Sequence, residues 1–142
     1  RSAKAASETS ELIADSLEIM AMAHPFDETL RKILFKTACQ LDFTAHEKGC
    51  VITIEGPRFS TVAESKMFRA FGADVINMST APEAMLANEA GIPYAAVAMS
   101  TDYDCWKEDE KVVSWQEILA VFEQNAANVK QLLISTIENL NA

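Results

Sequence analysis

The feature that most constrains the fold is an alternation of short β-rich and helical segments through the middle of the chain. A β-rich run over 50–54 precedes a helical pattern that ends near Gly72, and a second short strand is expected over 74–77. Another helical pattern stops at Gly91, and the continuous apolar run over 94–99 is typical of a strand buried on both faces. Because such strands pair in parallel through right-handed crossovers, the sequence predicts an α/β protein with a partial parallel or mixed twisted sheet flanked by helices.

Capping signals predict where three helices begin. Thr61, Thr80 and Ser114 each precede a glutamate by three residues, which is the spacing of a capping box. Thr80 is therefore expected to be the N-cap of the helix that stops at Gly91. The long final helix is expected to bury an apolar stripe at helical spacing, made of Ile118, Phe122, Ala126, Val129 and Leu133.

The first fifty residues predict two helices and a hairpin. Apolar residues at helical spacing over 8–22 favour an amphipathic helix that ends before Pro25. Asp27 is expected to cap a second helix. Short strands over 43–47 and 50–54 are expected to be joined by a turn at Lys48-Gly49. The buried face of the second helix is expected to hold Leu30, Ile33, Leu34, Ala38 and Leu41.

Composition argues against several classes of function. The 142 residues are the size of one domain, and 12 Lys and Arg against 21 Asp and Glu give a net charge of −9. Such an acidic surface repels nucleic acids and anionic membranes, so we expect neither as a partner. No apolar stretch approaches the roughly 20 residues that span a bilayer, and no secretory signal pattern is visible. We therefore expect a cytoplasmic protein.

Common catalytic and metal motifs are also missing from the sequence. Three cysteines without a CxxC pair and two histidines provide too few ligands for a structural zinc site, so no metal is expected. The four glycines fit neither dinucleotide-binding nor P-loop spacing, and no histidine has a nucleophile in a recognised setting. The adjacent Cys105 and Trp106 are interpreted as packing residues, without a role in chemistry.

Polar and aromatic residues instead follow each of the three expected strands. The segments concerned are 55–60, 77–80 and 100–104. Ligands of open parallel sheets bind at the carboxyl ends of the strands, so these three segments are expected to share one rim. Arg58, in the first of them, is expected to form a structural ion pair with Glu55 or Glu64.

The residues at this rim suit a small, flat, polar ligand. Phe59 would stack on it, Met78 would supply an apolar contact, and Asp102 with Asp104 would bond to amino or ring nitrogens. Ser79, beside a helix N-terminus, would favour an anion such as phosphate. A structural interpretation stays open for each residue. The ring and thioether would then be core packing, and the two aspartates, which alternate along an extended segment, would point to opposite sides.

Four motifs of this region occur together in a known family. EGPRFS, GADVINMST, PE and TDYDCW follow one another in this order. Over roughly residues 24–138 the chain resembles the methylthioadenosine phosphorylases, within the trimeric purine nucleoside phosphorylase family. The resemblance implies cleavage of 5′-methylthioadenosine by inorganic phosphate to adenine and 5-methylthioribose 1-phosphate. It also implies phosphate as co-substrate without a further cofactor, a homotrimer in the full-length form, and a location in the cytoplasm and also in the nucleus.

The resemblance assigns roles to residues at the rim. Asp102 and Asp104 are the catalytic candidates: Asp102 would engage N7 and the 6-amino group of adenine, and Asp104 would support it. Enzymes of the family for 6-oxopurines carry Asn at the position of Asp102, which implies a preference for 6-aminopurines. Ser79 would bind phosphate, Phe59 would pack against the base, and Met78 would lie under the ribose. The substrate-binding candidates are Phe59, Ser60, Met78, Val113, Trp115 and Ile118.

Members of this family are nearly twice as long as the chain. The resemblance therefore predicts a single, incomplete nucleoside phosphorylase-like domain over 1–142, in which residues 1–23 are unlike the family and most of the phosphate site is missing. Two alternatives stay open. One is a nucleoside phosphorylase with a broader choice of purines, and the other is a truncated, non-catalytic chain that keeps the base half of the pocket.

Overall fold

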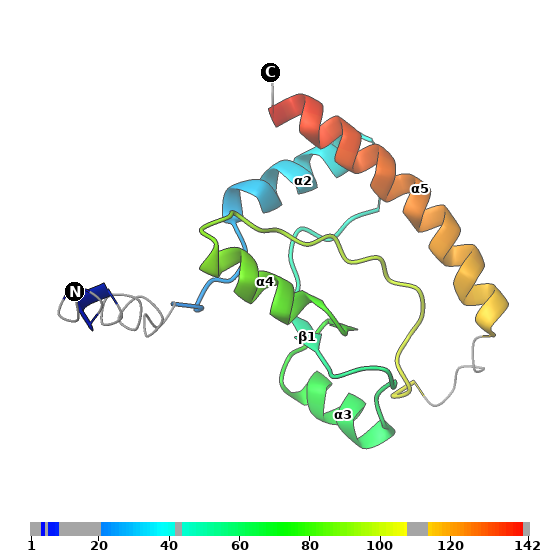
Figure 1. Cartoon of the computed structure of the whole chain (residues 1–142). Helices are drawn as coiled ribbons and strands as arrows, with labels where there is room; N and C mark the ends of the chain where they lie inside the picture. Colours follow the sequence, from blue (N-terminus) through cyan, green and yellow to red (C-terminus); the bar gives the residue numbers. More distant parts are fainter. Residues whose placement is uncertain (1–3, 5, 9–20, 42–43, 108–113, 141–142) are drawn as a thin grey trace.

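The sheet of the chain consists of two short parallel strands joined through a helix. A computed structural model describes residues 4, 6–8, 21–41, 44–107 and 114–140. Strand β1 (Val51–Thr53) pairs with β2 (Val75–Asn77), and Val51 lies opposite Val75. The helices are α2 (Glu28–Gln40), α3 (Val62–Ala70), α4 (Thr80–Glu89) and α5 (Trp115–Leu140). Figure 1 shows α3 and α4 beside the strands, and α2 packed against the C-terminal half of α5.

The crossover from β1 through α3 to β2 confirms the predicted parallel pairing. Helix α3 begins as its sequence predicts, because the Thr61 hydroxyl accepts a hydrogen bond from the Glu64 N–H at 3.2 Å. In return, the Glu64 carboxylate accepts from the Thr61 N–H at 2.8 Å, which completes the capping box. Gly72 follows the helix with φ of +83°, a left-handed conformation that glycine adopts without steric cost.

The predicted hairpin around Lys48-Gly49 is wrong in the described residues. Residues 44–50 form no strand, and residue 43 lies outside the part of the chain that the structure describes. The backbone of Cys50 is directed to the other strand instead: its N–H donates to the Asp74 carboxylate at 2.7 Å, and its carbonyl accepts from the Asp74 N–H at 2.8 Å. These bonds extend the parallel pairing and leave the backbone of residue 50 no hairpin partner.

The predicted third strand is also wrong. Residues 94–99 cross the molecule as a segment without strand pairing, and Val97 is 37% exposed. The ends of this segment are held by helices. The Tyr94 carbonyl accepts from the Asp27 N–H at 2.6 Å, and the Ser100 carbonyl accepts from the Asn125 side chain at 3.0 Å.

The best-buried contact between helices joins α2 and α5. The predicted face of α2 is confirmed, with Ala38 buried and the other four residues half-buried. Asp27 caps this helix as expected, since its carboxylate accepts from the Leu30 N–H at 2.7 Å. Across the interface, the Asn139 side chain donates to the Thr37 hydroxyl at 3.3 Å. Thr37 is only 2% exposed whereas Asn139 is exposed, so this polar contact lies at the edge of the interface.

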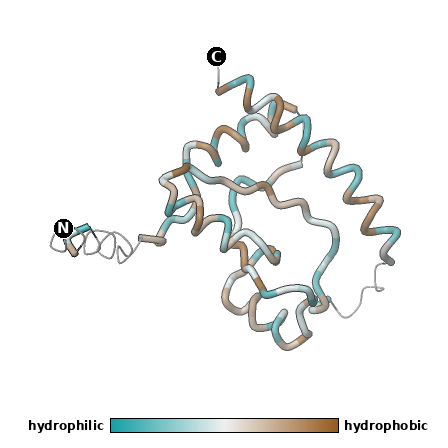
Figure 2. The backbone as a smooth tube through the Cα atoms, viewed as in Figure 1, coloured by the Kyte–Doolittle hydropathy of each residue, from teal (hydrophilic) through white to brown (hydrophobic). Residues whose placement is uncertain are grey.

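The buried stripe of α5 differs in part from the prediction. Its start is as expected, because Ser114 and Glu117 form reciprocal capping bonds of 3.3 and 2.7 Å. Leu132 and Thr136 are buried, whereas Phe122 and Leu133 are 46% and 45% exposed. Apolar and polar residues alternate all along this helix (Figure 2), so hydropathy leaves several stripes possible. Because α2 packs against this helix, the side of α5 that carries Leu132 and Thr136 is the buried one.

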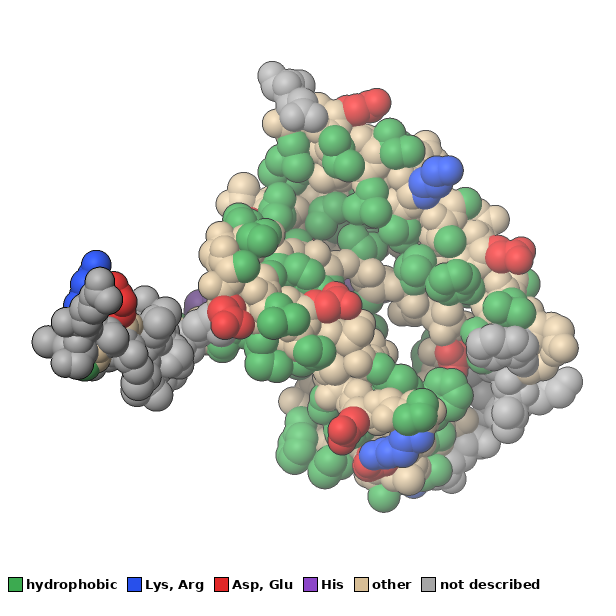
Figure 3. Space-filling model, viewed as in Figure 1, with side chains coloured by type: hydrophobic (Ala, Val, Ile, Leu, Met, Phe, Trp, Pro, Cys, Tyr) green, Lys and Arg blue, Asp and Glu red, His purple; other side chains and the backbone are tan. Residues whose placement is uncertain are grey.

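The helix predicted over 8–22 lies almost entirely outside the described residues. Of the residues that are described, residue 8 is helical, whereas residues 21 and 22 are not. None of the helices within the described ranges is long and apolar enough to cross a membrane. Apolar side chains are spread over the face of the molecule that Figure 3 shows. Exposed apolar residues of the α3 and α4 region include Met67, Phe71, Met85 and Leu86.

Truncation of two adjacent leucines tests the orientation of α5. Leu132→Ala is expected to lower the free energy of unfolding by about 2 to 5 kcal/mol, because the buried side chain leaves a cavity. Leu133→Ala, a chemically identical change at a 45% exposed position, is expected to cost less than about 1 kcal/mol. Urea unfolding followed by circular dichroism measures both, and equal losses would contradict the described packing.

Candidate functional site

The loops that follow β1 and β2 meet at the carboxyl ends of the strands, as the sequence predicts. A Cβ atom added to Gly56 would lie 3.0 Å from the Met78 sulfur, so a larger residue at this position would require the Met78 side chain to shift. The Thr53 hydroxyl donates to the Asn77 side-chain oxygen at 2.9 Å. It also accepts from the Ala81 N–H at 3.0 Å. One hydroxyl thus joins the ends of both strands to the start of α4.

Residues 100–106 lie against the loop after β1, although no strand leads into them. The Cys105 thiol donates to the Ser60 carbonyl at 3.3 Å. The Trp106 ring lies under the Arg69 guanidinium of α3, with 3.6 Å between the guanidinium carbon and the ring centroid. The three predicted loops are therefore linked. The loop over 55–60 contacts the loop over 77–80, and side-chain contacts attach residues 100–106 to the loop over 55–60.

The two catalytic candidates have different surroundings. Asp102 is exposed, and its carboxylate accepts a hydrogen bond from the Thr101 hydroxyl at 2.7 Å. Asp104 is half-buried, with the Oδ2 atom enclosed by protein. Burial raises the pKa of the neighbouring Cys105 thiol, and the negative charge of Asp104 raises it further. Asp102 is thus open to solvent, whereas one oxygen of Asp104 is enclosed by protein.

The remaining site candidates are mostly open to solvent. Phe59 is 79% exposed and Met78 is 41% exposed, so neither is a core packing residue. Ser60 is half-buried and Ser79 is exposed. Ile118 is half-buried in the first turn of α5, and Val113 and the side chain of Trp115 lie outside the described residues. The chain presents an aromatic ring, a thioether and a carboxylate on neighbouring, solvent-facing loops.

The start of α4 differs from its predicted cap. Ser79 is the N-cap residue and Thr80 the first helical residue, so the predicted Thr80 cap is wrong. The Thr80 hydroxyl bonds to the side-chain nitrogen of Asn77 instead. The oxygen of the same amide accepts from the N–H groups of Ser79 and Thr80 at 3.4 and 3.3 Å. Asn77, at the end of β2, thus replaces Thr80 as the capping side chain.

The Arg58 side chain is engaged in an ion pair with Glu64. Two hydrogen bonds of 2.8 and 2.6 Å join the guanidinium to the carboxylate, which settles the choice between Glu55 and Glu64. The hydrogen bond from Arg58, followed by those from Thr61, lowers the pKa of Glu64 to about 2. Arg58 therefore holds the loop before Phe59 against the first turn of α3.

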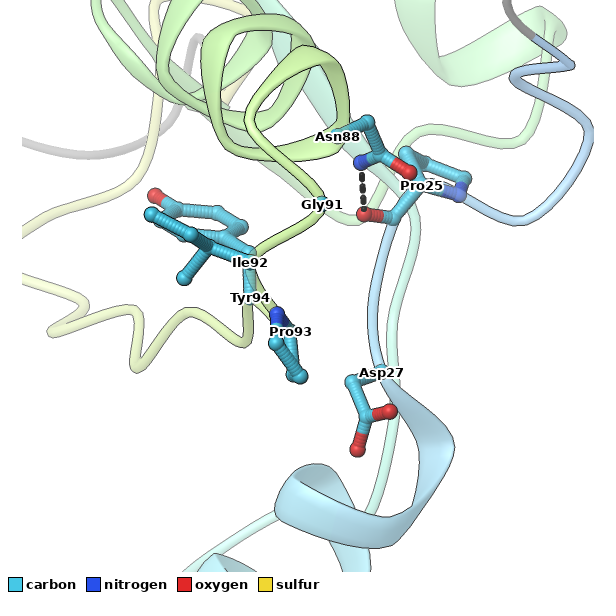
Figure 4. Close-up of a pocket in the computed structure, with 7 residues that line it drawn as sticks. All are labelled: Pro25, Asp27, Asn88, Gly91, Ile92, Pro93 and Tyr94. Carbon is cyan, nitrogen blue, oxygen red and sulfur yellow. Dashed lines mark hydrogen bonds between the residues drawn. The ribbon is translucent and has the colours of Figure 1, made fainter.

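Two surface depressions of the described chain lie away from this rim. One is lined by residues just before α2, by Asn88 of α4 and by the segment that follows α4 (Figure 4). It is bridged by a hydrogen bond of 3.0 Å from the Asn88 side chain to the Pro25 carbonyl. Another surrounds Arg31, which already pairs with Glu28 at 2.7 Å. Within the described residues, no group of three or more His, Cys, Asp or Glu is placed to hold a metal ion.

A model of one protein family matches almost the whole chain. The family is described as the phosphorylase superfamily, and the match covers residues 9–138. The chain belongs to the phosphorylase superfamily. The match starts at residue 9, whereas the resemblance inferred from the motifs starts near residue 24.

Curated relatives in this superfamily carry a more specific name. An S-methyl-5′-thioadenosine phosphorylase of Xenopus tropicalis is 52% identical over 121 residues, which cover 85% of this chain and 43% of the relative. The protein of the same name from Danio rerio is 49% identical over 119 residues, or 84% of this chain and 42% of the relative. The chain therefore spans less than half the length of these phosphorylases.

Solved phosphorylase structures resemble the chain over most of its length. Methylthioadenosine phosphorylase from Schistosoma mansoni in complex with adenine matches with a TM-score of 0.79 and 36% identity. That match covers 87% of this chain and 49% of the solved one. A variant of the adenosine/methylthioadenosine phosphorylase of the same organism, in complex with methylthioadenosine, matches with a TM-score of 0.78 and 34% identity, covering 87% and 47%. The nucleoside phosphorylase fold is thereby confirmed.

Sequence reasoning misses the contacts that attach the aspartate segment to α3 and to the loop before it. Cys105 and Trp106 are adjacent to Asp104, yet their partners Ser60 and Arg69 lie 45 and 37 positions earlier in the chain. No periodicity or local motif relates positions so far apart. The only signal is the composition of TDYDCW, whose aromatic residues flank the acidic ones.

The Arg58–Glu64 pair predicts a stability loss in acid. The folded-state pKa of Glu64 is about 2 and its ordinary value is 4.5, so its contribution is present above about pH 4.5 and is lost as pH falls toward 2. In Glu64→Gln, the urea midpoint is expected to fall less steeply as the pH decreases from 4.5 to 2. Some decrease is expected to remain, because Arg31 lowers the pKa of Glu28 to about 2 and Glu28 titrates over the same range.

Arg58→Met tests the same ion pair from the other partner. It removes the main cause of the lowered pKa of Glu64, so the urea midpoint is again expected to fall less steeply between pH 4.5 and 2. The double variant Arg58→Met, Glu64→Gln is expected to behave like Glu64→Gln alone. Parallel midpoint curves for the wild type and Glu64→Gln would contradict the assignment.

Proposed function

We propose that the chain forms the purine-binding part of an S-methyl-5′-thioadenosine phosphorylase. The reaction is the cleavage of 5′-methylthioadenosine by inorganic phosphate to adenine and 5-methylthioribose 1-phosphate. The observation that carries the proposal is the position of the aspartate segment: the exposed Asp102 and the inward-facing Asp104 are held against the loop that carries Phe59. The names of the relatives and the adenine complexes of the solved structures support it.

Asp102 is the proposed proton donor to the leaving base. A phosphate oxygen attacks C1′ of the ribose while the C1′–N9 bond breaks, so positive charge develops on the sugar and the bonding electron pair moves to the purine. A proton from Asp102 to N7 neutralises the departing base, and solvent returns the proton to the carboxylate. Asp104 supports this residue from the enclosed side of the segment.

Phe59 and Met78 are proposed to contact the base and the ribose. The exposed ring of Phe59 offers one face for stacking on adenine, and the Met78 thioether provides a polarisable surface under the sugar. Ser60, Val113, Trp115 and Ile118 complete the proposed surroundings of the nucleoside.

Ser79 is proposed to bind the phosphate co-substrate, and no further cofactor is required. Its exposed hydroxyl lies at the N-terminus of α4, where the positive end of the helix dipole favours an anion. The net charge of −9 gives no general attraction for phosphate, so local donors must hold it.

We also propose that the active form is a homotrimer in the cytoplasm, as the family resemblance implies. Sedimentation equilibrium tests the trimer.

Adenosine is the second substrate to consider. The solved structures from Schistosoma mansoni include proteins named adenosine/methylthioadenosine phosphorylase, whose name combines two 6-aminopurine nucleosides. A carboxylic acid at Asp102 fits both, because it donates to N7 and its other oxygen accepts from the 6-amino group. Inosine lacks that amino group and is expected to be the poorer substrate.

Adenine release tests the proposed reaction directly. The purified chain is incubated with 5′-methylthioadenosine, with and without inorganic phosphate, and adenine is separated and quantified. Phosphate-dependent release is the expected result. Adenine binding by calorimetry without turnover would support the alternative of a non-catalytic, base-binding chain. If the chain neither releases nor binds adenine, the proposal is overturned.

Asp102→Asn tests the proposed proton donor. Loss of a general acid costs about 10²- to 10⁴-fold in rate, so kcat with 5′-methylthioadenosine is expected to fall by at least about 10²-fold. The ratio of inosine to methylthioadenosine turnover is expected to rise, since an amide can donate to the 6-oxygen. Glu123→Gln, the same carboxylate-to-amide change on an exposed residue of α5, is the matched control. Unchanged adenine release by Asp102→Asn would eliminate this role.

A further inference from the structure

A stack of cationic and aromatic side chains attaches the aspartate segment to α3. The Arg69 guanidinium lies 3.6 Å from the centroid of the Trp106 ring. The Tyr103 ring meets Trp106 edge to face, with 5.9 Å between centroids and 86° between planes. The Lys107 ammonium in turn lies 3.6 Å from the centroid of Tyr103. Such contacts are attractive because ring faces are electron-rich.

Arg69 is the member of this stack that comes from a different element. Tyr103, Trp106 and Lys107 all belong to the segment itself, so contacts among them shape the segment without fixing its place. Arg69 lies in the last turn of α3, whose capping box at the other end fixes the helix on the loop after β1. The contact between Arg69 and Trp106 therefore transmits the position of α3 to the segment that carries both aspartates.

The backbone of the segment provides little support of its own. Residues 101–104 belong to neither a helix nor a strand, and the Lys107 N–H donates to the Asp104 carbonyl at a long 3.3 Å. The thiol of Cys105 gives one further attachment to Ser60, and a thiol is a weak donor. Besides the bond from Asn125 to the Ser100 carbonyl, side-chain contacts with α3 and the loop before it thus carry much of the positional restraint on Asp102 and Asp104.

We propose that Arg69 is a positioning residue for the segment containing Asp102 and Asp104, acting through its contact with Trp106. This inference rests on the proposed function, in which those aspartates engage the purine. Arg69 touches neither carboxylate in the described geometry. Its effect is on the base side of the reaction alone, because the segment it holds contributes no proposed phosphate ligand.

Arg69→Met tests this role, since it removes the cation and retains an unbranched side chain. Adenine affinity and kcat are each expected to fall about two- to fivefold, the factor of an exposed cation–π contact. The KM for phosphate is expected to stay constant, and Arg69→Lys is expected to recover part of the loss. Lys130→Met, a cation-to-methionine change on the exposed side of α5, is the matched control.

A double-variant comparison separates positioning from a general loss of stability. In a Trp106→Leu background the partner of Arg69 is missing, so Arg69→Met is expected to change adenine affinity no further. The proposal would be overturned if Arg69→Met lowered adenine affinity by the same factor in both backgrounds, or if it raised the KM for phosphate by an equal factor. Urea midpoints of the four proteins identify any variant that fails to fold, and Arg69→Lys then takes the place of Arg69→Met.

Hydrogen exchange makes the result independent of the proposed reaction. Amides of residues 101–107 are expected to exchange about two- to fivefold faster in Arg69→Met, while those of α2 keep their wild-type rates. If the wild type neither binds nor releases adenine, the proposed function fails and the exchange data still decide whether Arg69 holds the segment. Unchanged exchange at 101–107 would overturn the inference even in an active enzyme.

Discussion

The parallel pairing of β1 with β2 and the bond at its end determine where the loops of the candidate site lie. The Thr53 hydroxyl donates to Asn77 across the pair and accepts from the first turn of α4. The Asn77 amide then caps the same helix through the N–H groups of Ser79 and Thr80. Two adjacent side chains thus fix the direction in which the chain leaves β2. Because the loop after β1 packs against Met78, its position follows from the same arrangement.

Features that depend on local sequence could be predicted, and features that depend on distant partners could not. The caps at Asp27, Thr61 and Ser114 need only residues three positions away, and all three form. The cap expected at Thr80 fails because the amide of Asn77, at the end of β2, takes its place. The apolar run over 94–99 has the composition of a strand, but a strand also needs a neighbour, and neither β1 nor β2 pairs with it.

The same distinction applies to the candidate site. Strand order predicts that the loops after β1 and β2 meet, and the contact between Gly56 and Met78 confirms it. The aspartate segment reaches the site by another route, since it follows no strand and is held by Cys105 and Trp106. Partners on α3 are invisible in the local sequence because a cation–π contact has no fixed spacing along the chain. The roles of the individual residues in substrate binding stay predictions.

The double use of Glu64 limits which residues can occupy its position. One carboxylate caps α3 through Thr61 and also binds Arg58, next to the exposed ring of Phe59. Glutamine keeps the cap and loses the ion pair, and aspartate is one methylene too short to span both partners. Variation at positions 58, 61 and 64 is therefore coupled, so a substitution tolerated at one of them depends on the residues at the other two. Substitutions in the loop that carries Phe59 therefore depend on the sequence at the start of α3.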